Sequence, residues 1–291
     1  MRLGVAVRPP LRRRAAEANG PSGLDLVVGL ARAAEDAGYD ALFLDGRAAP
    51  VEDAAGEPLA RVDPYVVLGA VAVSTSALQL GCLAPTLDDR PPSLLAKVVT
   101  ALDACSDGRA VLALGLGDLP ADESELERLG EGLEVCRALL RVPSPSFVGR
   151  HYHLERAFNE PRPVPRESGL PIAVAVPADA SAFAVAGVLE LATRLAELCV
   201  LEVRSSDAAA ARVRAVREEL TPFARRAGRV DGGPGLLVRL PVSRLEPPAV
   251  AERVERCLAA GADGVVLDWA AEGVGPDDLA AVGKLVAAES S

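Results

Sequence analysis

Arginine side chains form the most concentrated positive charge in this sequence. Arg12, Arg13 and Arg14 follow one another in a chain that has 31 basic and 41 acidic residues. Guanidinium groups match the geometry of carboxylates and phosphates, so this arginine run is a candidate anion site. Ser243 and Arg244, which follow a later apolar segment, are a second candidate. A solvated loop face or a contact between subunits is the competing interpretation of the arginine run.

A carboxylate and two glycines follow other apolar segments. Asp45 is a candidate catalytic group; alternatively it caps or pairs locally, with Arg47 as the obvious partner. Gly115 and Gly117 lead into a helix-forming segment, as in a phosphate loop, but Pro120 stands where a third glycine is needed. The acidic residues that follow would repel a phosphate. A tight turn is therefore favoured over a phosphate site.

The two histidines, His151 and His153, could be considered as metal ligands. Their spacing would put both rings on one side of an extended segment. Glu155 is the only nearby carboxylate, and no cysteine lies at a metal-ligand spacing. A role in loop packing is therefore favoured, and we predict no metal site.

Composition narrows the class of protein. Of 291 residues, 50% are hydrophobic and 25% are charged, which is typical of a globular domain. The net charge of −10 disfavours nucleic acid and anionic membranes as partners. No segment is long and apolar enough for a membrane helix, and the N-terminus does not resemble a signal peptide. The five scattered cysteines favour a reduced, cytoplasmic protein.

Apolar strand-like segments alternate with helix-like segments along the whole chain. The predicted strands cover residues 3–7, 40–44, 78–83, 110–114, 172–176, 199–203, 235–240 and 264–267. The predicted helices cover residues 24–37, 63–75, 93–105, 123–140, 182–195, 207–227, 247–261 and 276–288. This order predicts one (β/α)8 barrel domain over residues 1–291, with a proline-rich insertion at 143–169 after the fourth helix. An open doubly wound sheet is the alternative. In a barrel, the candidate residues follow the carboxyl ends of strands, where barrel enzymes have their active sites.

Several segments in this order resemble the luciferase-like monooxygenase family. They are residues 31–46 (ARAAEDAGYDALFLDG), 63–81, 94–109, 113–118 (ALGLGD), 147–154 (FVGRHYHL), 161–174 and 260–267 (AGADGVVL). Members of the family are barrel enzymes that use reduced flavin or the deazaflavin coenzyme F420, and they often form dimers. The resemblance therefore implies an oxidoreductase or monooxygenase that binds FMN or coenzyme F420 and a small organic substrate.

The resemblance also implies roles for particular residues. Pro85 and Thr86 stand where the family has an aliphatic–threonine pair beneath the cofactor ring. The turn at Gly115 and Gly117 would lie near the same ring, with Asp45 close by as the catalytic candidate. The arginine run and the Ser243–Arg244 pair would bind the anionic tail of the cofactor.

Other positions depart from the family pattern. Gly46 stands where a histidine often follows the aspartate, and Arg90 replaces the histidine of a His-Pro pair. Pro177 and Asp179 occupy the segment that is usually a Gly-Gly-Ser-like phosphate loop. These departures leave a second hypothesis open, in which the chain is a cofactor-free barrel that acts as a binding or partner subunit. Either form would be a homodimer or a heteromer with a related barrel.

Overall fold

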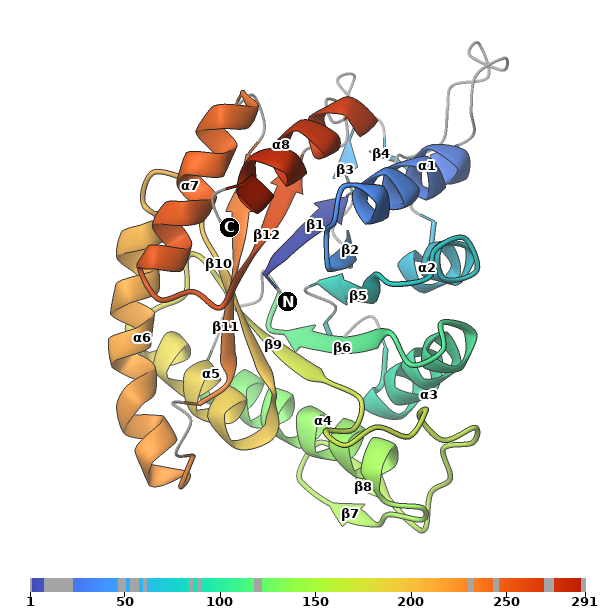
Figure 1. Ribbon diagram of the computed structural model, residues 1–291. Coiled ribbons are helices and arrows are strands. Elements are labelled where there is room, and N and C mark those ends of the chain that lie inside the picture. Colours follow the sequence, from blue (N-terminus) through green and yellow to red (C-terminus); the bar gives the residue numbers. More distant parts are fainter. Residues whose placement is uncertain are drawn as a thin grey trace.

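Eight parallel strands close into a barrel (Figure 1). The structure is a computed structural model, and it describes residues 2–7, 23–46, 51–52, 58–59, 62–83, 86–87, 90–117, 122–229, 233–242, 246–269 and 275–288. The barrel strands are β1 (Leu3–Val7), β2 (Ala41–Asp45), β5 (Gln79–Leu83), β6 (Ala110–Gly115), β9 (Ile172–Val176), β10 (Leu198–Glu202), β11 (Gly235–Pro241) and β12 (Gly264–Trp269). The sheet closes because β1 pairs with both β2 and β12. The predicted barrel is confirmed, and the open doubly wound sheet is excluded.

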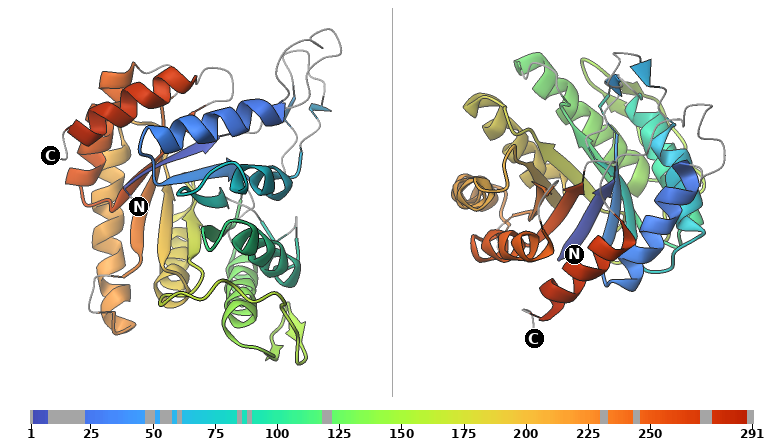
Figure 2. Two further views of the ribbon diagram at one scale, coloured as in Figure 1. Left: turned by 45° about the vertical axis from the view of Figure 1, so that its right-hand side comes forward. Right: turned by 90° about the horizontal axis from the view of Figure 1, so that it is seen from above.

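Helices surround the barrel on its outside (Figure 2). They are α1 (Gly23–Asp36), α2 (Pro64–Ala72), α3 (Pro92–Cys105), α4 (Glu123–Arg141), α5 (Ala182–Leu195), α6 (Ala209–Arg226), α7 (Pro247–Ala259) and α8 (Pro276–Ala288). Asp63, Asp122 and Ser181 cap α2, α4 and α5, because their side chains accept hydrogen bonds from first-turn amides. Within the described ranges, no helix has both the length and the apolar character needed to cross a membrane.

The strands divide the core into two layers. Alternate side chains face the helices or the barrel interior. The interior cluster includes Phe43, Val200, Leu237 and Val266, all at most 1% exposed. The Phe43 ring lies so close to Gly81 that a Cβ there would come within 2.8 Å of it. The middle of the barrel is therefore filled, and polar groups lie beyond it at the strand ends.

The predicted insertion lies along the outside of α3 and α4. Two small antiparallel sheets lie outside the barrel: β3 (Val51–Glu52) with β4 (Pro58–Leu59), and β7 (Phe147–Val148) with β8 (His153–Leu154). The β7–β8 hairpin belongs to the insertion. The Glu131 carboxylate of α4 accepts hydrogen bonds from the backbone amides of residues 150–152 at 2.6–3.0 Å. Arg166 donates to Asp103 of α3 at 2.7 Å. These contacts fasten the insertion to the outer surface of the barrel.

Candidate active site

One arginine and three carboxylates meet inside the barrel at the carboxyl ends of its strands. Arg239 of β11 donates from Nε to Asp268 Oδ2 at 3.0 Å and from Nη1 to Glu202 Oε1 at 3.0 Å. Its Nη2 donates to Asp45 Oδ2 at 2.8 Å. We call these four residues the Arg239 network. A single side chain thus joins β2, β10 and β12 across the barrel.

Strand register explains why the four side chains converge. Glu202 and Arg239 are register partners on neighbouring parallel strands, so both face inward. Pro241 of β11 is the register partner of Asp268 of β12, so the Asp268 carboxylate also faces the barrel interior. Asp45 follows the inward-facing Phe43 by two residues, so it faces the interior as well.

The network is buried to different depths. The side chain of Arg239 is 3% exposed and that of Asp45 is 5%, whereas Asp268 and Glu202 are 12% and 18% exposed. Burial lowers the pKa of Arg239, but attraction by Asp268, Asp45 and Glu202 outweighs it and raises the pKa above that of ordinary arginine. Arg239 therefore stays charged. One cation faces three carboxylates, so these four side chains carry a formal charge of −2 when ionised.

Small residues line the opposite side of the same strand ends. Gly115 of β6 is the register partner of Ala175 of β9, and a Cβ on the glycine would come within 3.0 Å of the alanine Cβ. Gly117 has a φ of +62°, and a Cβ there would lie 2.5 Å from Thr86 Cγ2. We call Gly115, Gly117, Ala175 and Thr86 the glycine wall. The structure thus brings three of the predicted cofactor residues together.

Asp45 points into the barrel, as the sequence indicated for a functional group. Its described partner is Arg239, which is 194 residues away in the chain. The local partner named from the sequence, Arg47, lies outside the described residues. The other predicted site residues outside the described ranges are Arg12, Arg13, Arg14, Pro85, Ser243 and Arg244.

Of the four network residues, only Asp45 was predicted from the sequence as a site residue. Arg239 was available as a lone charged residue within the apolar strand GLLVRLP, and Glu202 as the last residue of LCVLE. The strand predicted over residues 199–203 runs one residue past Glu202. The pattern therefore did not mark Glu202 as a functional residue at the strand end. The useful signal was the alternation of side chains, because a charge at an inward position of a barrel strand needs partners.

Two residues that depart from the family pattern, Arg90 and Asp179, form ion pairs with nearby residues. Arg90 forms an ion pair with Asp63, and its guanidinium lies 5.1 Å from the centroid of the Tyr65 ring. Asp179, in the turn between β9 and α5, forms an ion pair with Arg204 after β10. The negative charge of Asp179 is therefore balanced by a neighbouring arginine.

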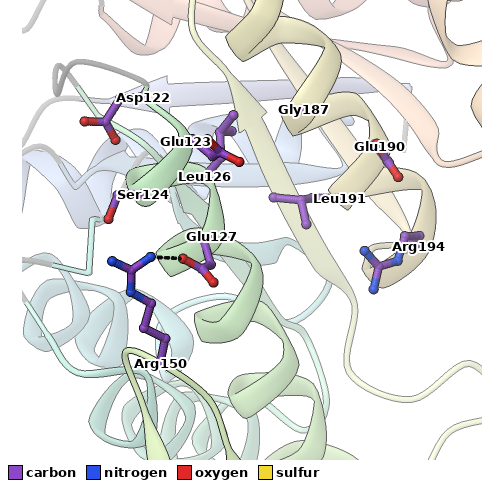
Figure 3. A pocket seen from close by; sticks show the side chains of 10 residues that line it. All are labelled: Asp122, Glu123, Ser124, Leu126, Glu127, Arg150, Gly187, Glu190, Leu191 and Arg194. Atoms are coloured by element: carbon purple, nitrogen blue, oxygen red, sulfur yellow. Dashed lines mark hydrogen bonds and ion pairs between the residues drawn. The ribbon is translucent and has the colours of Figure 1, made fainter.

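A surface pocket lies away from the strand ends, between α4 and α5. It has a volume of about 760 Å³, and Glu127, Arg150, Glu190 and Arg194 are among its lining residues (Figure 3). His151 lies beside it, with Nε2 3.4 Å from Glu127 Oε2. His151 lies just before β8, and His153 lies within it.

Comparison with known proteins defines the family. The family model described as "Luciferase-like monooxygenase" matches residues 1–280. The chain belongs to the luciferase-like monooxygenase family. An F420-dependent glucose-6-phosphate dehydrogenase from Nakamurella multipartita is 30% identical over 170 residues, which are 53% of this chain and 48% of that protein. A second such dehydrogenase, from Kineococcus radiotolerans, is 29% identical over 49% of this chain and 44% of its own. The matches thus span about half the length of these curated relatives.

Two solved structures superpose on nearly the whole chain. An F420-dependent secondary alcohol dehydrogenase, solved with an F420–acetone adduct, has a TM-score of 0.77 at 13% identity and covers 99% of this chain and 98% of its own. A monooxygenase from Streptomyces bottropensis has a TM-score of 0.72 at 19% identity, covering 99% and 98%. At these identities the likeness supports the fold alone.

The glycine wall is compatible with a flat cofactor ring. Gly115 and Ala175 project at most a methyl group toward the interior, and a Cβ at position 115 would crowd the Cβ of Ala175. Such a surface allows a planar group to lie close to the backbone. The residues that would hold the ring are therefore Gly115, Gly117 and Thr86, with the Arg239 network across from them.

Proposed function

We propose that this luciferase-like barrel is an oxidoreductase that binds coenzyme F420 or FMN and acts on a small organic substrate. A bound flavin or deazaflavin would supply hydride transfer or, for a flavin, oxygen chemistry. The glycine wall would position the ring, and the network would fix charged groups beside the substrate. The observation that carries the proposal is the Arg239 network, which lies where barrel enzymes have their active sites.

The free-energy cost of burying the charges of the Arg239 network supports a catalytic protein over an inactive barrel. Removing charged groups from water is unfavourable, and a buried ion pair often stabilises a fold no better than apolar residues would. Three carboxylates around one arginine are a poor way to fill a barrel, but a suitable way to hold charges in fixed positions for chemistry. A cofactor-free partner subunit would have no use for this arrangement, and it is retained only as an outcome of the experiment.

Titration with each cofactor tests the proposal. We expect the wild type to bind F420 or FMN with micromolar or tighter affinity, about −8 kcal/mol or better. Gly115→Val should weaken binding by at least about tenfold, because it fills the glycine wall. Gly29→Val is the matched control, since nothing lies within 4 Å of a Cβ at that helix position. Absence of binding to wild type would favour the cofactor-free alternative, and equal binding by both variants would exclude the glycine wall.

We further propose that the protein forms a homodimer in the cytoplasm through α2 and α3. The sequence of α2, PYVVLGAVA, is apolar on all sides, whereas an outer barrel helix usually has a polar face. Val66 is 68% exposed, and Val73 and Leu94 are also exposed. Gly69 and Ala101 would allow a second copy to approach closely, and a face with so little charge fits an equally apolar one.

Sedimentation analysis tests this dimer. Val66→Glu should convert it to a monomer, whereas Val148→Glu, at a 79% exposed residue of β7, should not. A monomeric wild type would contradict the homodimer, and a heteromer with a related barrel would then be sought.

A further inference from the structure

Arg90 lies in the connection between β5 and α3, and its guanidinium is only partly used. Its Nη2 forms an ion pair with Oδ2 of Asp63, and its Cζ lies 5.1 Å from the centroid of the Tyr65 ring. The Arg90 side chain is 20% exposed. Among the described residues, neither Nε nor Nη1 of Arg90 donates a hydrogen bond. Two of the three guanidinium nitrogens therefore keep N–H donors for a ligand.

A structural arginine elsewhere in the barrel uses its donors differently. Arg109, just before β6, donates from all three nitrogens, to four backbone carbonyl oxygens at 2.7–3.0 Å and to the hydroxyl of Thr75 at 3.1 Å. It thereby fastens the end of α2 to the turn before β6. Arg90 is also partly buried, but one ion pair holds it. Surplus donors on a guanidinium that is held in place are typical of an anion site.

Asp63 neutralises Arg90 only in part. Its Oδ1 accepts hydrogen bonds from the amides of Tyr65 and Val66 at 2.9 and 3.3 Å, so the same carboxylate caps α2. A helix N-terminus carries partial positive charge, and this carboxylate is therefore shared between the helix and the guanidinium. Within the described ranges, Asp63 is the one carboxylate paired with Arg90. The buried Tyr65 ring adds a fixed surface, so Arg90 is oriented before a ligand arrives.

We propose that Arg90 is the centre of a binding site for an oxyanion, the carboxylate or phosphate group of a ligand. Guanidinium N–H groups match the geometry of both. The site lies at the carboxyl ends of the strands, where α2 and α3 begin, and Thr86 belongs to the same connection four residues earlier. The oxyanion is carried by the substrate or by the tail of a cofactor, and both sources present the same chemistry to Arg90. The site is argued from the contacts of Arg90 alone and goes beyond the proposed function.

Calorimetric titration with inorganic phosphate tests the site directly, at low salt and in a buffer without other oxyanions. We expect the wild type to bind phosphate with a dissociation constant of roughly 1 mM, and Arg90→Met to weaken binding at least about tenfold. Arg204→Met is the matched control, because Arg204 is also paired with one aspartate but is 75% exposed, and it should bind phosphate as the wild type does. Absence of phosphate binding to the wild type, or equal binding by Arg90→Met, would overturn the inference.

Asp63→Asn separates a binding role from a structural one. The amide oxygen still caps α2, whereas the negative charge that competes with the ligand is removed. Phosphate should therefore bind severalfold more tightly than to the wild type. Unchanged or weaker binding would contradict a site centred on Arg90. This variant and the wild type decide the point if Arg90→Met does not fold.

FMN and riboflavin identify the source of the oxyanion, because they differ only in the phosphate group. If Arg90→Met weakens binding of FMN and not of riboflavin, the site holds the cofactor phosphate. If it changes neither while phosphate binding is lost, the site holds an anionic group of the substrate. For a deazaflavin, F420 and its tail-free form serve the same comparison. A wild type that binds no cofactor would overturn the proposed function, whereas the phosphate titration still decides the Arg90 site.

Discussion

Two clusters of arginine and carboxylate side chains lie at opposite ends of the barrel, and they are built differently. At the carboxyl ends, Arg239 meets three carboxylates through side-chain contacts alone. At the amino ends, Asp103 is 0% exposed and accepts from Arg166 at 2.7 Å and from the backbone amides of Val164 and Ala110 at 2.8 and 3.2 Å.

The difference fits a structural role for the Asp103 cluster and the proposed functional role for the Arg239 network. Asp103 has one cation and two amide donors, so its charge is balanced and it fastens the insertion and the start of β6. The Arg239 network has an excess of carboxylates and holds no loop among the described residues. Charged residues at the amino end of a barrel generally serve stability, whereas active sites lie at the carboxyl end. The positions of the two clusters match this division, which supports the proposed role of the Arg239 network.

The largest effect is expected for Arg239→Met. This change leaves three carboxylates without their shared cation, and removal of one partner from a buried ion pair costs about 3–5 kcal/mol. The loss in the free energy of unfolding should shrink in acid, because the carboxylates of the variant are relieved by protonation. Urea unfolding at neutral and acidic pH measures the loss of stability and its dependence on pH. A loss that is the same at both pH values would contradict the electrostatic interpretation.

A smaller but substantial loss is expected for Asp103→Asn. The amide keeps the size of the side chain but removes the charge that Arg166 and two backbone amides bind, at a cost of about 2–3 kcal/mol. The insertion at 143–169 should also become more sensitive to proteolysis, since Val164 and Arg166 lose their anchor. The matched change Asp45→Asn should cost at most about 1 kcal/mol, because it relieves repulsion among the three carboxylates. If Asp45→Asn proved the more destabilising, the division between the clusters would be wrong.

The smallest effect is expected for Glu131→Gln. Burial raises the pKa of Glu131, but hydrogen bonds from the amides of His151, Arg150 and Tyr152 outweigh it and lower the pKa below 4.5. The ionised carboxylate therefore stabilises the fold above the ordinary pKa, and this contribution is lost as the pH falls through the lowered value. Thermal unfolding should show that Glu131→Gln is less stable than the wild type by about 1 kcal/mol at neutral pH. This difference should disappear in acid. A deficit that grows in acid would contradict this assignment.

The sequence predicted the barrel well because periodic features specify it. Gly38 and Gly108, with φ values of +79° and +85°, lie just beyond the predicted helices 24–37 and 93–105, and Asp63 with Pro64 begins α2. The network was harder to predict. Alternation identifies Arg239 and Glu202 as inward-facing only once strand bounds are known, and no local pattern shows that Arg239 reaches Asp45, 194 residues away. Gly117 and Thr86 were paired by family resemblance, and their contact depends on a positive φ that the sequence does not specify.

Affinity for oxidised cofactor in the matched variants Asp45→Asn and Asp103→Asn tests the central claim most directly. Calorimetric titration is carried out at a temperature where both variants are folded. We predict that Asp45→Asn changes the dissociation constant at least about threefold while leaving stability nearly unchanged, and that Asp103→Asn lowers stability while leaving the dissociation constant unchanged. An altered affinity in Asp103→Asn together with an unaltered one in Asp45→Asn would contradict the assignment of function to the Arg239 network.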